Sequence, residues 1–92
     1  MRVEFEKNRN RAALYDDKDI LVGESTFSVS DTKWIIDHTY VDESLRGKGY
    51  ASKLVEKIVE NARKENVKII PLCPYAKKEF EKKFEYNDVL FR

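Results

Sequence analysis

The spacing of apolar residues changes once along this 92-residue chain, and that change limits the fold class. Up to about Val41, apolar and polar residues alternate in short runs, as is typical of half-buried β-strands. From Gly49 to about Glu65, apolar residues recur every three or four positions, which is typical of an amphipathic α-helix. A chain of this length has room for one modest core. We therefore expect a single α+β domain over residues 1–92.

Four strands are expected before the helix. They cover residues 2–6, 11–15, 20–29 and 33–41, and the short polar segments between them predict an antiparallel meander. Gly23 marks a candidate bulge in the third strand. Strict alternation along the fourth strand predicts two faces, one with Trp34, Ile36, His38 and Tyr40 and the other with Ile35, Asp37, Thr39 and Val41.

The second half of the chain predicts a crossover and another helix. Residues 67–72 form an apolar run that reads as a fifth strand, and a strand–helix–strand crossover places it parallel to strand 33–41 with the C-terminal ends together. Pro74 suits the first turn of a second helix at about 75–84, with Ala76, Phe80 and Phe84 facing inward. The tail after Phe84 shows no periodic pattern. The predicted fold is therefore a mixed sheet of a four-strand antiparallel meander and a parallel fifth strand, with a central crossover helix and a second helix.

Composition excludes several partners. The 18 Lys and Arg residues nearly balance the 17 Asp and Glu residues, whereas general nucleic-acid binding needs a clear cationic excess. No apolar run approaches the ~20 residues that cross a bilayer, and the N-terminal residues lack the apolar segment of a signal peptide. One cysteine and one histidine cannot build an ordinary structural zinc site. We expect a cytoplasmic chain, most simply a monomer, without a metal, nucleic-acid or membrane partner.

The segment from Asp42 to Ala51 joins the fourth strand to the long helix and carries the clearest chemical signal. Gly47 and Gly49 allow backbone conformations that other residues avoid, and the first amides of a helix have no partner within it. Together they predict a pocket for phosphate oxygens, to which Arg46 and Lys48 add positive charge. The P-loop motif and the dinucleotide fingerprint are absent. The alternative is a glycine-rich helix start with incidental basic residues.

The run Arg46-Gly47-Lys48-Gly49-Tyr50-Ala51 resembles the Q/R-x-x-G-x-G/A acetyl-CoA loop of the GNAT-superfamily N-acetyltransferases. The runs His38-Thr39-Tyr40-Val41 and Pro71-Leu72-Cys73-Pro74-Tyr75 are similar to a compact single-domain GNAT-like subgroup. The resemblance covers roughly residues 23–84. It implies a GNAT-like mixed sheet, acetyl-CoA as co-substrate and an amine as acceptor.

The resemblance also implies roles for individual positions. Backbone amides from Arg46 to Ala51 would hold the CoA pyrophosphate, and the backbone of Tyr40 and Val41 would pair with the pantetheine arm where strands four and five splay apart. An amide of strand four near that gap would polarise the acetyl carbonyl. The chain departs from the family pattern because no helices fit between its first two strands and little follows Phe84. Those parts commonly shape the acceptor pocket, so a small amine and a protein-borne amine both stay open as acceptors.

Cys73 and His38 are the candidate catalytic residues. Cys73 is expected at the mouth of the gap, where its thiol would take the acetyl group as a thioester, and the helix beginning at Pro74 favours the thiolate. His38 would act as the general base for Cys73 or for the amine. The alternatives are a small buried cysteine and a packed histidine. Tyr75 is expected either to hydrogen-bond near the reacting centre or to pack.

Three functions fit these features. The leading hypothesis is an acetyl-CoA-dependent N-acetyltransferase that uses Cys73 as an acyl carrier or transfers the acetyl group directly. The alternative is a noncatalytic acyl-CoA-binding or sensing module, and a third hypothesis is a regulatory domain that binds another nucleotide. The lysines of the second helix are expected to form a solvated face rather than a phosphate site; they are Lys77, Lys78, Lys82 and Lys83.

Overall fold

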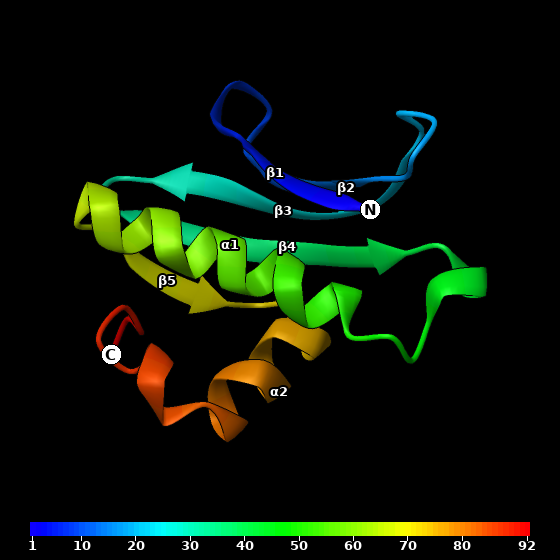
Figure 1. Ribbon diagram of the computed structural model, residues 1–92. Coiled ribbons are helices and arrows are strands. Elements are labelled where there is room, and N and C mark those ends of the chain that lie inside the picture. Colours follow the sequence, from blue (N-terminus) through cyan, green and yellow to red (C-terminus); the bar gives the residue numbers. More distant parts are fainter.

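The computed structural model describes residues 1–92 and contains one five-stranded sheet and two α-helices (Figure 1). The strands are β1 (Arg2–Glu6), β2 (Arg11–Tyr15), β3 (Leu21–Ser30), β4 (Lys33–Val41) and β5 (Lys68–Pro71). The helices are α1 (Tyr50–Glu65) and α2 (Pro74–Lys82). The sheet order is β1-β2-β3-β4-β5, with antiparallel pairs up to β4 and a parallel β4–β5 pair. The predicted mixed α+β sheet is confirmed.

Helix α1 packs across one face of the sheet, as Figure 1 shows. Its apolar stripe is fully buried, because residues three and four positions apart share one helix face. The buried side chains of the stripe are Leu54, Val55, Ile58, Val59 and Ala62. On the facing side of the sheet, the ring of Phe27 stacks on Trp34 with centroids 4.4 Å apart. The helix ends at Glu65. The following residue, Asn66, adopts a left-handed conformation, and the Val67 amide donates a hydrogen bond to the Ala62 carbonyl.

A bulge in β4 changes the two faces that alternation predicts. Thr26 pairs with His38 and Phe27 pairs with Ile36, so Asp37 is an extra residue without a partner in β3. The bulge shifts the alternation by one position. The prediction that His38 and Tyr40 share the face of Trp34 and Ile36 is therefore wrong. Beyond the bulge, Thr39 and Val41 lie on the face covered by α1, and His38 and Tyr40 are exposed.

Strands β4 and β5 separate early. Their parallel pairing ends at Ile36 and Pro71. The Ile36 carbonyl accepts hydrogen bonds from the amides of Leu72 and Cys73 at 3.0 and 2.9 Å, and the chain then turns into α2. From Asp37 onward, β4 has no strand neighbour on the β5 side.

The C-terminal segment differs from the prediction for the second helix. Helix α2 ends at Lys82, and Phe84 lies in a short 3₁₀ segment, η3 (Phe84–Tyr86), with 78% of its surface exposed. The prediction that Phe84 faces the core is wrong, because the helical periodicity stops before it. Tyr86 and Val89 take the buried positions instead, and Leu90 forms an isolated bridge to Ile69 of β5. Neither helix is both long and apolar enough to span a membrane.

Candidate functional site

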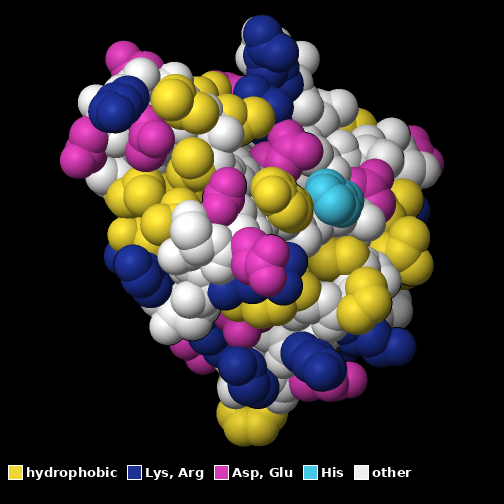
Figure 2. Space-filling view, turned by 90° about the vertical axis from the view of Figure 1, so that its right-hand side faces the viewer, with side chains coloured by type: hydrophobic (Ala, Val, Ile, Leu, Met, Phe, Trp, Pro, Cys, Tyr) yellow, Lys and Arg dark blue, Asp and Glu magenta, His cyan; other side chains and the backbone are white.

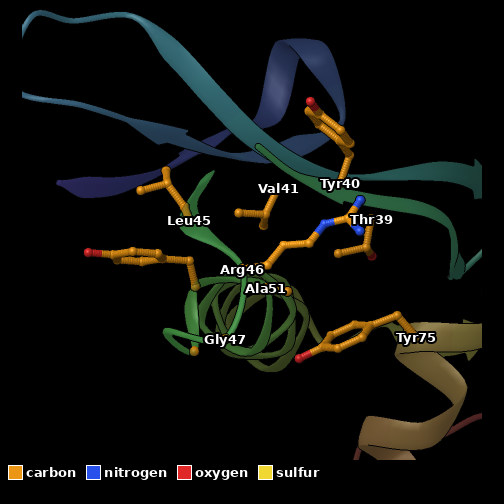
Figure 3. A pocket seen from close by; sticks show the side chains of 10 residues that line it. Thr39, Tyr40, Val41, Leu45, Arg46, Gly47, Ala51 and Tyr75 are labelled. Carbon is orange, nitrogen blue, oxygen red and sulfur yellow. The ribbon is translucent and has the colours of Figure 1, made fainter. Parts of the chain in front are cut away.

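A cavity of about 400 Å³ opens where β4 ends and α1 begins (Figure 3). Its walls come from the end of β4, from the loop that follows it and from the first turns of α1 and α2. The lining residues are Thr39, Tyr40, Val41, Leu45, Arg46, Gly47, Gly49, Tyr50, Ala51 and Tyr75. The cavity therefore contains most of the segment in which the sequence predicts a phosphate pocket.

Two glycines shape the loop before α1. Gly47 and Gly49 have φ angles of 81° and 83°, in the left-handed region that side chains disfavour. A Cβ atom at either position would meet nothing within 4 Å, so backbone conformation rather than space requires glycine. Upstream, the Asp42 carboxylate accepts hydrogen bonds from the amide and hydroxyl of Ser44 at 3.0 and 2.8 Å. The Ser44 hydroxyl, followed by its amide, lowers the pKa of Asp42, so a charged cap holds the 3₁₀ segment η2 (Glu43–Leu45).

The loop presents a row of free backbone amides. The first hydrogen bond of α1 runs from the Lys53 amide to the Gly49 carbonyl at 3.2 Å, and the amides of residues 47–52 donate to no acceptor within the chain. Free amides at a helix N-terminus carry partial positive charge and bind anions. Arg46 extends its side chain beside the cavity (Figure 3). Neither Arg46 nor Lys48 forms an ion pair. This end of the cavity suits a phosphate group.

Cys73 lies at the point where β4 and β5 part. It is the N-cap of α2, it is 7% exposed, and its Sγ accepts a hydrogen bond from the Ala76 amide at 3.4 Å. The same Sγ lies 3.4 Å from Thr39 Oγ1, which in turn lies 3.0 Å from Ser25 Oγ. The thiol is thus held between a helix start and the strand whose free edge faces it. Its position at the gap agrees with the prediction.

The structure does not bring His38 to Cys73. His38 is exposed and neighbours Thr39 in an extended strand, so their side chains point to opposite faces. The cyan histidine in Figure 2 lies at the surface, next to acidic side chains. Asp37 lies on the open face of the sheet, where its carboxylate accepts hydrogen bonds from Thr26 and Ser28 at 2.7 and 2.8 Å. The general base that we expected beside the thiol is absent, and a threonine hydroxyl takes that place.

Tyr75 enters the cavity from the first turn of α2. Figure 3 shows its hydroxyl pointing toward α1, whereas the ring of Tyr40 points away from the cavity. Burial, with a further contribution from the negative charge of Glu79, raises the pKa of Tyr75. A tyrosine is protonated at neutral pH in any case, so this hydroxyl can donate a hydrogen bond to a bound group.

The positions of two polar residues near the cavity, Thr39 and Glu79, are not predicted by the sequence pattern. Alternation predicts Thr39 on the face opposite Trp34, because a bulge leaves no mark on an alternating pattern. Glu79 lies within a lysine-rich helix that looks solvated, yet it is buried and accepts a hydrogen bond from Ser52 of α1. The one available signal for Glu79 is its spacing of four residues from Tyr75, which places both side chains on one helix face.

The geometry supports a defined chemistry. An anion held at residues 47–52 can continue as an extended arm along the free edge of β4, because the backbone of residues 37–41 has no strand partner on that side. The other end of this free edge lies at Ile36, where the Cys73 amide bonds to the Ile36 carbonyl and the two strands part. No group of three or more His, Cys, Asp and Glu side chains is placed to hold a metal ion.

Comparison with known proteins agrees with this geometry. The family model described as GCN5-related N-acetyl-transferase matches residues 11–89. The solution structure of a GCN5-like putative N-acetyltransferase from Staphylococcus aureus is 35% identical, with a TM-score of 0.77, over 98% of this chain and 87% of that chain. No curated protein sequence matches significantly.

Larger acetyltransferases share the fold at lower identity. A putative acetyltransferase from Agrobacterium tumefaciens is 24% identical, with a TM-score of 0.62, over 78% of this chain and 55% of that chain. The ribosomal-protein-alanine N-acetyltransferase from Brucella melitensis biovar Abortus 2308 is 23% identical, with a TM-score of 0.62, over 78% of this chain and 59% of that chain. The chain spans little more than half of each, and these two likenesses concern the fold alone.

The parted mixed sheet and the glycine-rich helix start define a GNAT-like transferase domain. The chain belongs to the GCN5-related N-acetyl-transferase family, because the family model covers most of its length. The predicted family and the predicted enzyme class, an N-acetyltransferase, are confirmed.

Proposed function

We propose that the chain transfers the acetyl group of acetyl-CoA to an amine and that Cys73 carries the group between them. The observation that supports this most is the row of free amides at residues 47–52 beside a cavity that Thr39 also lines. Thr39 Oγ1 in turn lies 3.4 Å from the Sγ of the buried Cys73. A helix start with free amides fits a pyrophosphate, and the opening between β4 and β5 fits a thioester arm. The name of the S. aureus protein, a putative N-acetyltransferase, agrees with this reaction.

The chain offers a holder for each part of the co-substrate. The free amides from Gly47 to Ser52 hold the pyrophosphate, and the side chains of Arg46 and Lys48 add positive charge beside it. The backbone of Tyr40 and Val41, at the free edge of β4, pairs with the pantetheine arm. Acetyl-CoA itself supplies an activated acetyl group as a thioester.

Cys73 exchanges one thioester for another. Its Sγ forms a bond to the acetyl carbon, the bond from that carbon to the CoA sulfur breaks, and the Cys73 proton passes to the CoA sulfur. An uncharged amine then attacks the acetyl carbon, the bond to Sγ breaks, and an amine proton passes to Sγ. Both steps balance without a metal or a redox partner.

Thr39 and Tyr75 flank the thiol in this scheme. Thr39 Oγ1, at 3.4 Å, orients the sulfur toward the gap. The Tyr75 hydroxyl, which lines the cavity and is protonated at neutral pH like any tyrosine, is available to donate a hydrogen bond to a bound group. Charge that develops on the acetyl oxygen is stabilised by such donors and by strand amides.

Intact-mass measurement after incubation with acetyl-CoA tests the proposal. The native chain should gain one acetyl group that hydroxylamine removes at neutral pH, and Cys73→Ala should gain none. Cys73→Ser is the matched variant. Its hydroxyl can still cap α2, so the fold should stay intact while the thiol is lost. Unchanged acetylation of an amine by Cys73→Ser would overturn the relay, and failure to bind acetyl-CoA would overturn the function itself.

A further inference from the structure

Glu79 is a carboxylate buried between the two helices that bound the cavity. It lies in α2, one turn after Tyr75, and only 2% of its surface is exposed. Its Oε1 accepts a hydrogen bond from the Oγ of Ser52 in α1 at 2.8 Å. The proposed acetyl transfer gives this group no role.

Two lysines and one hydroxyl keep Glu79 ionised. Lys83 Nζ donates to Ser52 Oγ at 2.7 Å and lies 3.0 Å from Glu79 Oε1, and Lys82 Nζ lies 3.2 Å from Oε2. Burial by itself would raise the pKa of Glu79, but the hydrogen bonds from Lys83, Ser52 and Lys82 together outweigh burial and lower it. The side chain therefore carries a charge that its partners compensate.

Stability alone is a weak explanation for this arrangement. A buried ion pair often stabilises a fold no better than apolar side chains of similar volume, because desolvation offsets the attraction. What it adds is a fixed geometry. Ser52 directly follows Ala51 in the cavity wall, and Glu79 belongs to the helix that begins at Cys73. The bond between them therefore joins the amide row to the thiol-bearing helix.

We propose that Glu79 is a positioning residue, which through Ser52 fixes the start of α2, with Cys73 and Tyr75, relative to the phosphate-binding turn of α1. This role rests on the proposed function, since it concerns the path from the bound phosphate to the thiol. The phosphate amides themselves stay in place without Glu79, because they belong to the first turn of α1 and to the loop that precedes it. Loss of the Ser52–Glu79 hydrogen bond should slow acetyl transfer to Cys73 and leave the affinity for acetyl-CoA nearly unchanged.

Ser52→Ala and Glu79→Gln test whether the rate of acetyl transfer depends on this contact while the affinity for acetyl-CoA does not. Glu81→Gln is the matched control. Glu81 lies on the same helix, is exposed and makes no hydrogen bond to α1. At saturating acetyl-CoA and a temperature at which all variants are folded, Ser52→Ala should acetylate Cys73 about tenfold more slowly, since small misplacements of reacting groups are costly. Glu79→Gln keeps an oxygen that accepts the Ser52 hydrogen bond but loses both lysine ion pairs, so its rate should fall by a smaller factor. The dissociation constant for acetyl-CoA of Glu79→Gln should stay within about twofold of the native value, because Glu79 is not part of the amide row. Ser52→Thr keeps a hydroxyl that can bond to Glu79 and should retain most of the rate. Wild-type rates in both variants, or a change confined to the melting temperature, would overturn the proposal.

Hydrogen exchange in the free protein provides a readout that needs no acetyl-CoA. The Ala76 amide bonds to Cys73 Sγ, and the Lys77 amide bonds to the Cys73 carbonyl at 3.0 Å. In Ser52→Ala both amides should exchange about tenfold faster than in Glu81→Gln, because the start of α2 loses its tie to α1. Unchanged exchange would overturn the positioning role even if acetyl transfer is confirmed. If exchange is faster in Ser52→Ala but the native chain does not bind acetyl-CoA, the positioning role of the Ser52–Glu79 hydrogen bond is supported and only the proposed function is overturned.

Discussion

Thr39 Oγ1 lies 3.4 Å from Cys73 Sγ, across the gap where β4 and β5 part. The contact exists because the bulge at Asp37 turns Thr39 toward the face that α1 covers. The same hydroxyl lies 3.0 Å from Ser25 Oγ, which is fully buried. Thr39 thus connects the interior of the sheet to the candidate nucleophile.

Thr39→Val should destabilise the fold through Ser25. Valine has nearly the shape of threonine but no hydroxyl, so the buried Ser25 Oγ loses its hydrogen-bond partner. An unsatisfied buried polar group costs about 1–3 kcal/mol. Urea unfolding should show this loss, and adding Ser25→Ala should recover much of it. Equal stability of Thr39→Val and the native chain would contradict the buried contact.

His38→Ala should change little. The imidazole is exposed on the open face of the sheet, and surface substitutions usually shift stability by less than about 0.5 kcal/mol. The rate of Cys73 acetylation should stay within about twofold of the native rate at every pH, because no general base is lost. A bell-shaped pH profile that flattens in His38→Ala would show that the histidine takes part after all.

The sequence predicts the elements well and the site only in part. Alternation and helical spacing locate β1, β2, β4 and α1 closely, because one buried face controls each pattern. The bulge at Asp37 arises from the pairing with β3, a tertiary effect that alternation cannot report. That single shift exchanges the expected positions of His38 and Thr39.

The burial of Glu79 and the structure of the C-terminal tail could not be predicted from the sequence, for related reasons. Glu79 looks like part of a solvated lysine-rich face, and only its contact with Ser52 of α1 shows its burial. The tail lacks a period because Tyr86 and Val89 pack individually rather than along one helix face. The roles of Gly47 and Gly49 are predictable, because two closely spaced glycines just before a helix indicate a turn with unusual backbone conformations.

Substitutions at Gly49 should show whether the backbone conformation or the space for a side chain requires glycine at this position. The φ of 83° disfavours alanine by about 1–2 kcal/mol, while asparagine tolerates this region better. Asn10 and Asn66 already adopt it elsewhere in the chain. Calorimetric titration with acetyl-CoA should therefore show weaker binding for Gly49→Ala than for Gly49→Asn. The reverse order would mean that side-chain volume near the phosphate, not the φ angle, sets the requirement.

The stability of the fold should depend on pH through Glu79. Its pKa in the folded state lies below the ordinary value, so the unfolded state binds more protons in acid. The stabilisation is present above the ordinary carboxyl pKa and is lost as the pH falls through the folded-state pKa. Between about pH 5 and pH 3, the free energy of unfolding should fall more steeply for the native chain than for Glu79→Gln. Parallel profiles would show that Glu79 is not held as an ionised partner.

The proposed acetyl-CoA site depends above all on phosphate binding by the amides of residues 47–52. A titration of the ¹⁵N-labelled chain with acetyl-CoA, followed through its backbone amide signals, tests it most directly. The largest shifts should fall on the amides from Gly47 to Ser52, with a second set on the free edge of β4 near Tyr40 and Val41. Gly47→Val should weaken the response and keep the rest of the spectrum. Absence of binding, or shifts centred on another surface of the molecule, would contradict this assignment.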